Sequence, residues 1–160
     1  MTGIKFRIAL ICGRDLAAAD KTGFSDPYGV IRVNEKKYTT QYIKQTLNPD
    51  WDFHFDISVS PSRAPKHIAV TLWDKDKFGR DFMGELMIPF RNVFDRNQGD
   101  SFGGLPMNYN DPANQPSWFS LNKRSEKDNV KGQVMMKFGF VEDVIRSPTE
   151  YARYWDEITR

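Results

Sequence analysis

The chain has 160 residues, of which 39% are hydrophobic and 14% aromatic, and its formal net charge is +2. This length suits one domain with a real hydrophobic core, and the composition excludes an intrinsically disordered chain. No apolar run approaches the roughly 20 residues that a membrane-spanning helix needs.

The N-terminal segment and the single cysteine both bear on location. Arg7 and Arg14 interrupt the apolar stretch near the start, so the pattern of a signal peptide is absent. Cys12 has no partner for an internal disulfide. We therefore expect a cytoplasmic protein, recruited to membranes only peripherally.

Apolar and polar residues alternate in several short segments, which is the pattern of half-buried β-strands. Turn-forming Gly, Pro, Asn and Asp residues separate these segments. The predicted strands are 4–10, 28–33, 37–43, 51–59, 67–73, 83–88, 118–121 and 133–141. Eight short strands of this kind predict an all-β fold, an antiparallel β-sandwich.

Two further segments differ from the strands. Residues 89–116 lose the alternation and are rich in Gly, Pro and Asn, which predicts a long loop without an assigned role. Ser147, Pro148 and Glu150 form a capping-box pattern at the start of a helix. Apolar residues follow on one helical face, at Tyr151, Tyr154, Trp155 and Ile158.

This short C-terminal helix divides the chain into an expected sandwich domain, 1–143, and an extension, 144–160. We expect its apolar face to pack on the sandwich or on a following domain of the same chain. A helix that binds a protein partner or a membrane is the alternative.

Five aspartates stand in two predicted loops, one after the first strand and one after the fifth. In an up-and-down antiparallel order, connections after odd-numbered strands share one end of the sandwich. Both loops should therefore meet at one rim. The aspartates are Asp20, Asp26, Asp74, Asp76 and Asp81.

Carboxylates crowded on one rim repel one another unless a cation neutralises them. Calcium takes ~6–8 oxygen ligands in flexible geometry, whereas magnesium demands an octahedron and keeps its waters. Five aspartates, with backbone carbonyls of Lys21 and Lys75, would leave the coordination of two or three calcium ions incomplete. A lipid phosphate could then complete it.

An EF-hand is the competing interpretation, because Asp74, Asp76 and Glu85 partly fit its loop. Phe78 stands where that loop needs an oxygen ligand. The flanking segment 67–73 has strand periodicity and Pro89 follows closely, so helices on both sides are not expected.

Four motifs together resemble the C2 domain family, over about residues 4 to 141. They are DKTGFSDPY (20–28), LNPDW (47–51), WDKD (73–76) and DFMG (81–84). The resemblance implies a C2-type sandwich and calcium ligation by all five aspartates. The closing segment GQVMMKFGF (132–140) resembles the first strand of synaptotagmin-type C2 domains, which implies the circularly permuted type II topology of phospholipase C and HECT-type ubiquitin ligase C2 domains.

Aromatic and basic residues beside the aspartates predict calcium-dependent docking on anionic, phosphatidylserine-type membranes, which would target a larger protein there. Phe24 and Phe78 would insert, because aromatics at loop tips need a cover. Lys77 and Arg80 would face lipid phosphates. Residues that match the family's phosphoinositide-binding face are Tyr28, Lys37 and Trp73.

Other functional classes find less support in the sequence. A C2 scaffold for protein interaction, independent of calcium, is the main alternative. His54 and His67 fall in strand patterns, and no nucleophile–base pair is visible, so we do not expect an enzyme. Basic residues are scattered and no recognition motif occurs, so nucleic acid is not an expected partner.

Overall fold

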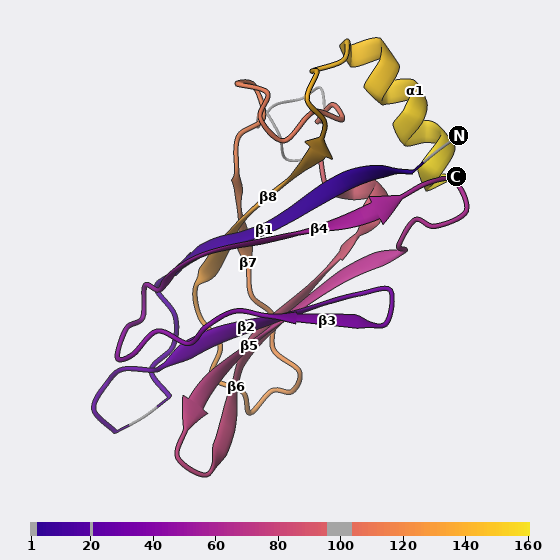
Figure 1. Ribbon diagram of the computed structural model, residues 1–160. Coiled ribbons are helices and arrows are strands. Elements are labelled where there is room, and N and C mark those ends of the chain that lie inside the picture. Colours follow the sequence, from indigo (N-terminus) through magenta and orange to yellow (C-terminus); the bar gives the residue numbers. More distant parts are fainter. Residues whose placement is uncertain (1–2, 20, 96–103) are drawn as a thin grey trace.

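The computed structural model describes residues 3–19, 21–95 and 104–160. Two four-stranded antiparallel sheets pack face to face, with one helix at the end where both termini lie (Figure 1). The first sheet has the order β4-β1-β8-β7 and the second the order β3-β2-β5-β6. The eight-stranded sandwich with a C-terminal helix predicted from the sequence is thus confirmed.

The first sheet contains β1 (Ile4–Arg14), β4 (Asp50–Val59), β7 (Ser117–Ser120) and β8 (Gln133–Val141). The second contains β2 (Pro27–Val33), β3 (Lys36–Thr39), β5 (His67–Asp76) and β6 (Gly79–Pro89). A 3-10 turn, η1 (Phe90–Asn92), follows β6, and the helix α1 covers Pro148–Thr159. No helix in these described ranges is long and apolar enough to cross a membrane.

Alternation along each strand builds the core. Phe6, Ile8 and Leu10 of β1 are fully buried and face the second sheet. A two-residue turn keeps the β2–β3 hairpin tight: Asn34 and Glu35 both have positive φ, at 51° and 69°, as a type I′ turn requires. The last strand, β8, lies between β1 and β7. The circular permutation implied by the resemblance stays a prediction.

Several strand boundaries differ from the prediction, and β1, for example, runs on to Arg14 instead of ending at residue 10. The third strand ends at Thr39 instead of residue 43, so residues 40–49 form a longer connection. The predicted loop 74–82 is largely strand, because β5 runs on to Asp76 and β6 begins at Gly79. Backbone pairing between β5 and β6 extends this hairpin beyond the alternating apolar segments from which the two strands are predicted.

The helix α1 packs on the sandwich, as expected. Ser147 caps it with both bonds of a capping box, and the side chains of Tyr151, Trp155 and Ile158 are buried. Trp155 stacks on Phe6 with ring centroids 5.6 Å apart, and Tyr151 lies parallel to Phe140 at 5.0 Å. The alternative that this apolar face binds a partner or a membrane finds no support, because most of the face is covered.

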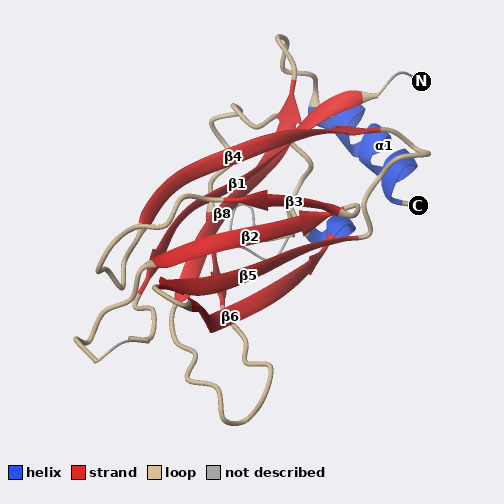
Figure 2. Cartoon of the chain, turned by 60° about the horizontal axis from the view of Figure 1, so that its bottom comes forward, coloured by secondary structure: helices blue, strands red, loops and turns tan. Residues whose placement is uncertain are grey.

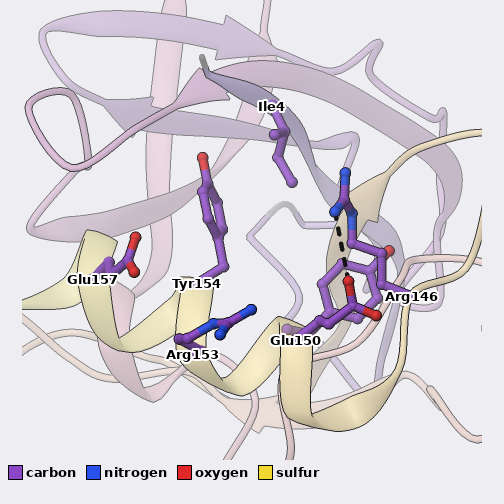
Figure 3. Close-up of a pocket in the computed structure, with 7 residues that line it drawn as sticks. Ile4, Arg146, Glu150, Arg153, Tyr154 and Glu157 are labelled. Carbon is purple, nitrogen blue, oxygen red and sulfur yellow. Dashed lines mark ion pairs between the residues drawn. The ribbon is translucent and has the colours of Figure 1, made fainter. Parts of the chain in front are cut away.

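The edge of the helix leaves a small cavity of about 180 Å³ against the start of β1. Figure 3 shows Ile4 and Tyr154 on one side of it and the ion pair of Arg146 with Glu150, 3.7 Å long, on the other. Mixed charges line this cavity, so it favours no single kind of ligand.

The described part of the long loop, from residue 104, continues the first sheet beyond the short strand β7. Tyr109 donates its N–H to Phe140 O (2.7 Å), and its backbone lies over Gly139, where a Cβ would come within 2.4 Å of Tyr109 Cα. Arg7 Cζ and Lys137 Nζ lie 5.2 Å and 4.4 Å from the centroid of the Tyr109 ring. Burial lowers the pKa of Lys137.

Candidate calcium and membrane-docking rim

The connections after β1, β3 and β5 lie together at the end of the sandwich away from α1 (Figures 1 and 2). We call four of the described aspartates there, Asp26, Asp74, Asp76 and Asp81, the acidic rim. The parity of the strands decides this arrangement, because each strand reverses the direction of its predecessor. Asp20 lies outside the described residues.

Buried polar contacts hold the first connection in place. The Ser25 hydroxyl donates to Ala17 O (3.0 Å) and accepts the N–H of Ala19 (2.9 Å), which closes the connection on itself. The buried indole of Trp51 donates to Pro27 O (3.1 Å). The entry into β2 is therefore tied to β4 in the opposite sheet.

Asp26 joins three segments that are far apart in the sequence. Its N–H donates to Asp74 Oδ1 at 2.6 Å, and its carbonyl accepts the N–H of Lys75 at 3.0 Å. Its carboxylate accepts the N–H of Gln45 at 2.7 Å. The first connection, the connection after β3 and the β5–β6 hairpin thus meet at one residue.

The remaining aspartates belong to the β5–β6 hairpin. Asp74 and Asp81 are direct cross-strand partners, so their side chains leave the hairpin on the same face. Asp74 is buried, with 3% exposure, whereas Asp76 and Asp81 are exposed. Asp76 Oδ1 accepts the N–H of Phe78 at 2.8 Å and so closes the turn.

The donor set suits calcium in kind, since it consists of carboxylates with backbone carbonyls nearby. Within the described residues, however, no three His, Cys, Asp or Glu side chains are arranged so that they could hold a metal ion. Lys21 is an exposed residue of the first connection, and Lys75 lies on β5 beside the rim. The roles of their carbonyls stay predictions.

Apolar side chains project around the acidic rim. Phe78 at the hairpin turn is 94% exposed and Phe24 of the first connection 46%. Sequence reasoning misses Tyr42, 37% exposed, because the alternation places it in a strand that in fact ends earlier. Lys75 Nζ lies 3.9 Å from the Tyr42 ring centroid, and Lys77 is exposed beside Phe78.

Tyr28, Trp73 and Lys37 share the outer face of the second sheet. Tyr28 pairs with Trp73 across β2 and β5, and Lys37 pairs with Arg32 across β3 and β2. A groove of about 550 Å³ runs from Tyr28 to Tyr42 and Arg80.

Two guanidinium groups cover the aromatic part of this face. Arg80 lies 3.8 Å above the Trp73 ring, and Arg124 lies 4.4 Å above Phe82 while it pairs with Glu85 at 2.6 Å. The sequence does not predict the position of Arg124 on this face, because Arg124 belongs to the β7–β8 connection, 39 residues from Glu85.

The groups considered for catalysis lie apart from one another. Both histidines are exposed, His54 on β4 and His67 at the start of β5. Burial, with a smaller effect of Asp50, raises the pKa of the half-buried Cys12 thiol. No hydrogen bond recorded for the described chain joins Cys12 to either histidine.

An antiparallel sandwich whose loops present carboxylates and aromatics at one end is the architecture of a peripheral binding module. The C2 domain family profile matches residues 4–103. The chain belongs to the C2 family, whose domains commonly bind calcium and lipid and act as binding or regulatory modules.

Relatives among characterised proteins are large. The chain is 34% identical over 134 residues to the Rho GTPase-activating protein gacEE of Dictyostelium discoideum, covering 82% of this chain and 20% of that protein. It is 43% identical over 82 residues to the human multiple C2 and transmembrane domain-containing protein 1, covering 51% of this chain and 8% of that protein. The chain thus spans a fifth or less of these relatives.

Solved structures show the same fold. A C2 domain of plant extended synaptotagmin 1 is 18% identical, with a TM-score of 0.62, and the match covers 88% of this chain and 95% of that one. A calcium-bound pair of C2 domains from extended-synaptotagmin 2 is 23% identical, with a TM-score of 0.62, covering 88% of this chain and 46% of that one.

Proposed function

We propose that this C2 domain docks on phosphatidylserine-rich membranes in response to calcium and brings a larger protein with it. The observation that carries the proposal is the hydrogen bond from Asp26 N–H to Asp74 Oδ1. It joins the first connection to the β5–β6 hairpin, so that aspartates distant in the sequence share one rim. We infer that Asp20, from the same connection, completes the ligand set.

Electrostatics make the docking conditional. Five carboxylates carry five negative charges and repel an anionic surface, and two divalent ions would offset four of these charges. Ligation requires the Asp76 and Asp81 side chains to turn toward Asp74, which their exposure allows. The basic side chains Lys75, Lys77 and Arg80 then dominate the local field, each worth ~1 kcal/mol near anionic lipid.

The exposed aromatics supply the apolar part of the affinity. Phe78 lies at the tip of the hairpin, so insertion would remove most of its surface from water. Full burial of such a side chain is worth about 1.5–3 kcal/mol. Phe24 contributes less, since about half of its surface is already covered.

Sedimentation with phosphatidylserine-containing vesicles tests the proposal. We expect binding with calcium, none with a chelator, and none in the variant Asp76→Asn with Asp81→Asn. The control, Asp143→Asn with Asp156→Asn, removes the same charge at the opposite end and should bind normally. Binding that ignores both the chelator and the rim variant would reject the proposal.

A calcium-independent scaffold for protein interaction is the second candidate. The observation in its favour is that the described side chains form no ready-made metal cluster. It predicts that calcium leaves the melting temperature unchanged, whereas ligation at the rim raises it.

A further inference from the structure

A second charged feature lies at the end of the sandwich opposite the acidic rim. A cavity of about 560 Å³ opens between the β4–β5 connection, the junction of β6 with η1, and the last residues of α1. Its lining includes Lys66, His67, Arg91 and Arg160, and none of the described residues that line it is Asp or Glu. We call it the basic cavity.

The walls of the basic cavity are rigid. His67 and Pro89 are cross-strand partners, and Phe90 donates its N–H to Lys66 O at 2.9 Å, which ties two walls together. Pro65 is buried in the β4–β5 connection and Pro89 lies at the junction of β6 with η1, so the backbone of these two walls has little freedom left to lose on binding. Ile158, 3% exposed, anchors the end of α1 beside them.

Two of the cationic side chains that line the basic cavity form no ion pair in the described part of the chain. Arg160 pairs with Asp156 at 2.9 Å, but neither Lys66 nor Arg91 has a carboxylate within 4.0 Å in the described part of the chain. Lys66 and Arg91 line the same cavity without a carboxylate partner, so a bound anion would reduce the repulsion between their charges.

Distance separates this feature from the acidic rim. β5 runs from His67 at the cavity to Asp76 at the rim, and ten residues at ~3.3 Å each place its ends about 30 Å apart. This is several times the Debye length of ~8 Å at physiological salt, so the two ends act independently.

We propose that the basic cavity binds a small, multiply phosphorylated anion, either free or as the headgroup of a lipid. The guanidinium fork of Arg91 matches phosphate oxygens bidentately, and Lys66 adds a point charge. The volume falls in the usual range for small-molecule sites, roughly 300–1,000 Å³, and is larger than one inorganic phosphate needs. A ligand with several phosphates uses all three walls.

Calorimetric titration with inositol hexakisphosphate, in the presence of a calcium chelator, tests the site without involving the rim. We expect one equivalent to bind and Lys66→Glu with Arg91→Glu to weaken it at least about ten-fold. The control, Lys127→Glu with Lys131→Glu, makes the same charge change in the exposed β7–β8 connection and should change the affinity less than about two-fold. Lys66→Gln with Arg91→Gln repeats the test if charge reversal prevents folding.

Vesicles containing phosphatidylinositol 4,5-bisphosphate, again with chelator, separate the two sources of phosphate. Binding of the soluble probe alone assigns a free ligand, and vesicle binding that Lys66→Glu with Arg91→Glu abolishes assigns a headgroup. If the cavity variant and the control variant Lys127→Glu with Lys131→Glu lose affinity equally, binding is general charge attraction and the proposal is overturned. The proposal is also overturned if neither the soluble probe nor the vesicles bind. Since no calcium is present, this failure would leave the function proposed for the rim untouched.

Discussion

Asp26 shows how much one residue contributes to the geometry of the rim. Its N–H, carbonyl and carboxylate each bind a different partner, namely Asp74, Lys75 and Gln45. The residue therefore orients the buried Asp74 carboxylate and couples the connection after β3 to the hairpin. Its position on the rim follows from strand parity, but these three bonds depend on cross-strand register.

Phe78 offers the sharpest test at the residue scale. Since it is 94% exposed, Phe78→Ala should change the free energy of unfolding by less than about 0.5 kcal/mol. Losing an inserted ring should weaken calcium-dependent vesicle binding about ten-fold or more. Met87→Ala, 62% exposed on β6 at a distance from the hairpin turn, is the control and should bind as the wild type does.

Cys12 gives a prediction about pH. Burial raises the pKa of its thiol, so the neutral form is favoured in the folded protein. Alkylation by iodoacetamide, followed against pH, should therefore have its midpoint above the ~8.5 of a free cysteine. A midpoint at or below that value would contradict the prediction.

The same shift acts on stability. The pKa of the Cys12 thiol is higher in the folded state than in the unfolded state. The contribution of the neutral thiol to the free energy of unfolding is therefore fully present below pH ~8.5, and it is lost as the pH rises through the folded-state pKa. Denaturant should return the alkylation midpoint of Cys12 to that of the free thiol.

At the scale of elements, the hairpin β5–β6 and the helix α1 behave differently. The hairpin is longer than the alternation of apolar residues predicts. Backbone pairing continues through Lys75 and Arg80, although neither side chain is buried. The helix follows its signal closely, because a capping box and an apolar stripe are local patterns.

Trp155 tests whether α1 is part of the folded unit. Its ring lies within 6 Å, between centroids, of Phe6, Phe90, Phe94 and Phe140. Trp155→Ala should therefore lower the free energy of unfolding by about 3–5 kcal/mol in denaturant titrations. Arg153→Ala, on the exposed side of the helix, should change it by less than about 0.5 kcal/mol.

The same experiment tests the expected division of the chain into a sandwich domain, 1–143, and an extension, 144–160. If the helix is an independent extension, Trp155→Ala will leave the unfolding of the sandwich unchanged. The aromatic contacts lead us to propose instead that the sandwich and α1 unfold as one cooperative unit.

The whole molecule has two charged ends of opposite sign, the acidic rim and the basic cavity, for which we propose cation and anion binding respectively. β5, which runs from one end to the other, is about 30 Å long, so a ligand at one end acts on the other only through overall stability. Occupancy of either end should therefore raise the melting temperature independently of the other.

Calcium should stabilise the native state by about 2.7 kcal/mol when its concentration is 100 times the dissociation constant. Differential scanning calorimetry with and without a chelator measures the corresponding rise in melting temperature. Asp76→Asn with Asp81→Asn should remove the rise, whereas Lys66→Glu with Arg91→Glu should leave it intact. A rise that persists in the rim variant would place the calcium site elsewhere.

The sequence by itself determined the number and order of the strands, the two-layer sandwich, the capped helix and the end at which the acidic connections meet. These follow from local periodicity and from strand parity, which need no knowledge of register. Only the tertiary structure decided the length of the β5–β6 hairpin, the position of Arg124 over Phe82, the burial of the helix face and the basic cavity. Each of these depends on contacts between segments far apart in the chain. Alternation along one strand predicts which face of the strand is buried, but it does not predict which distant residue packs against that face.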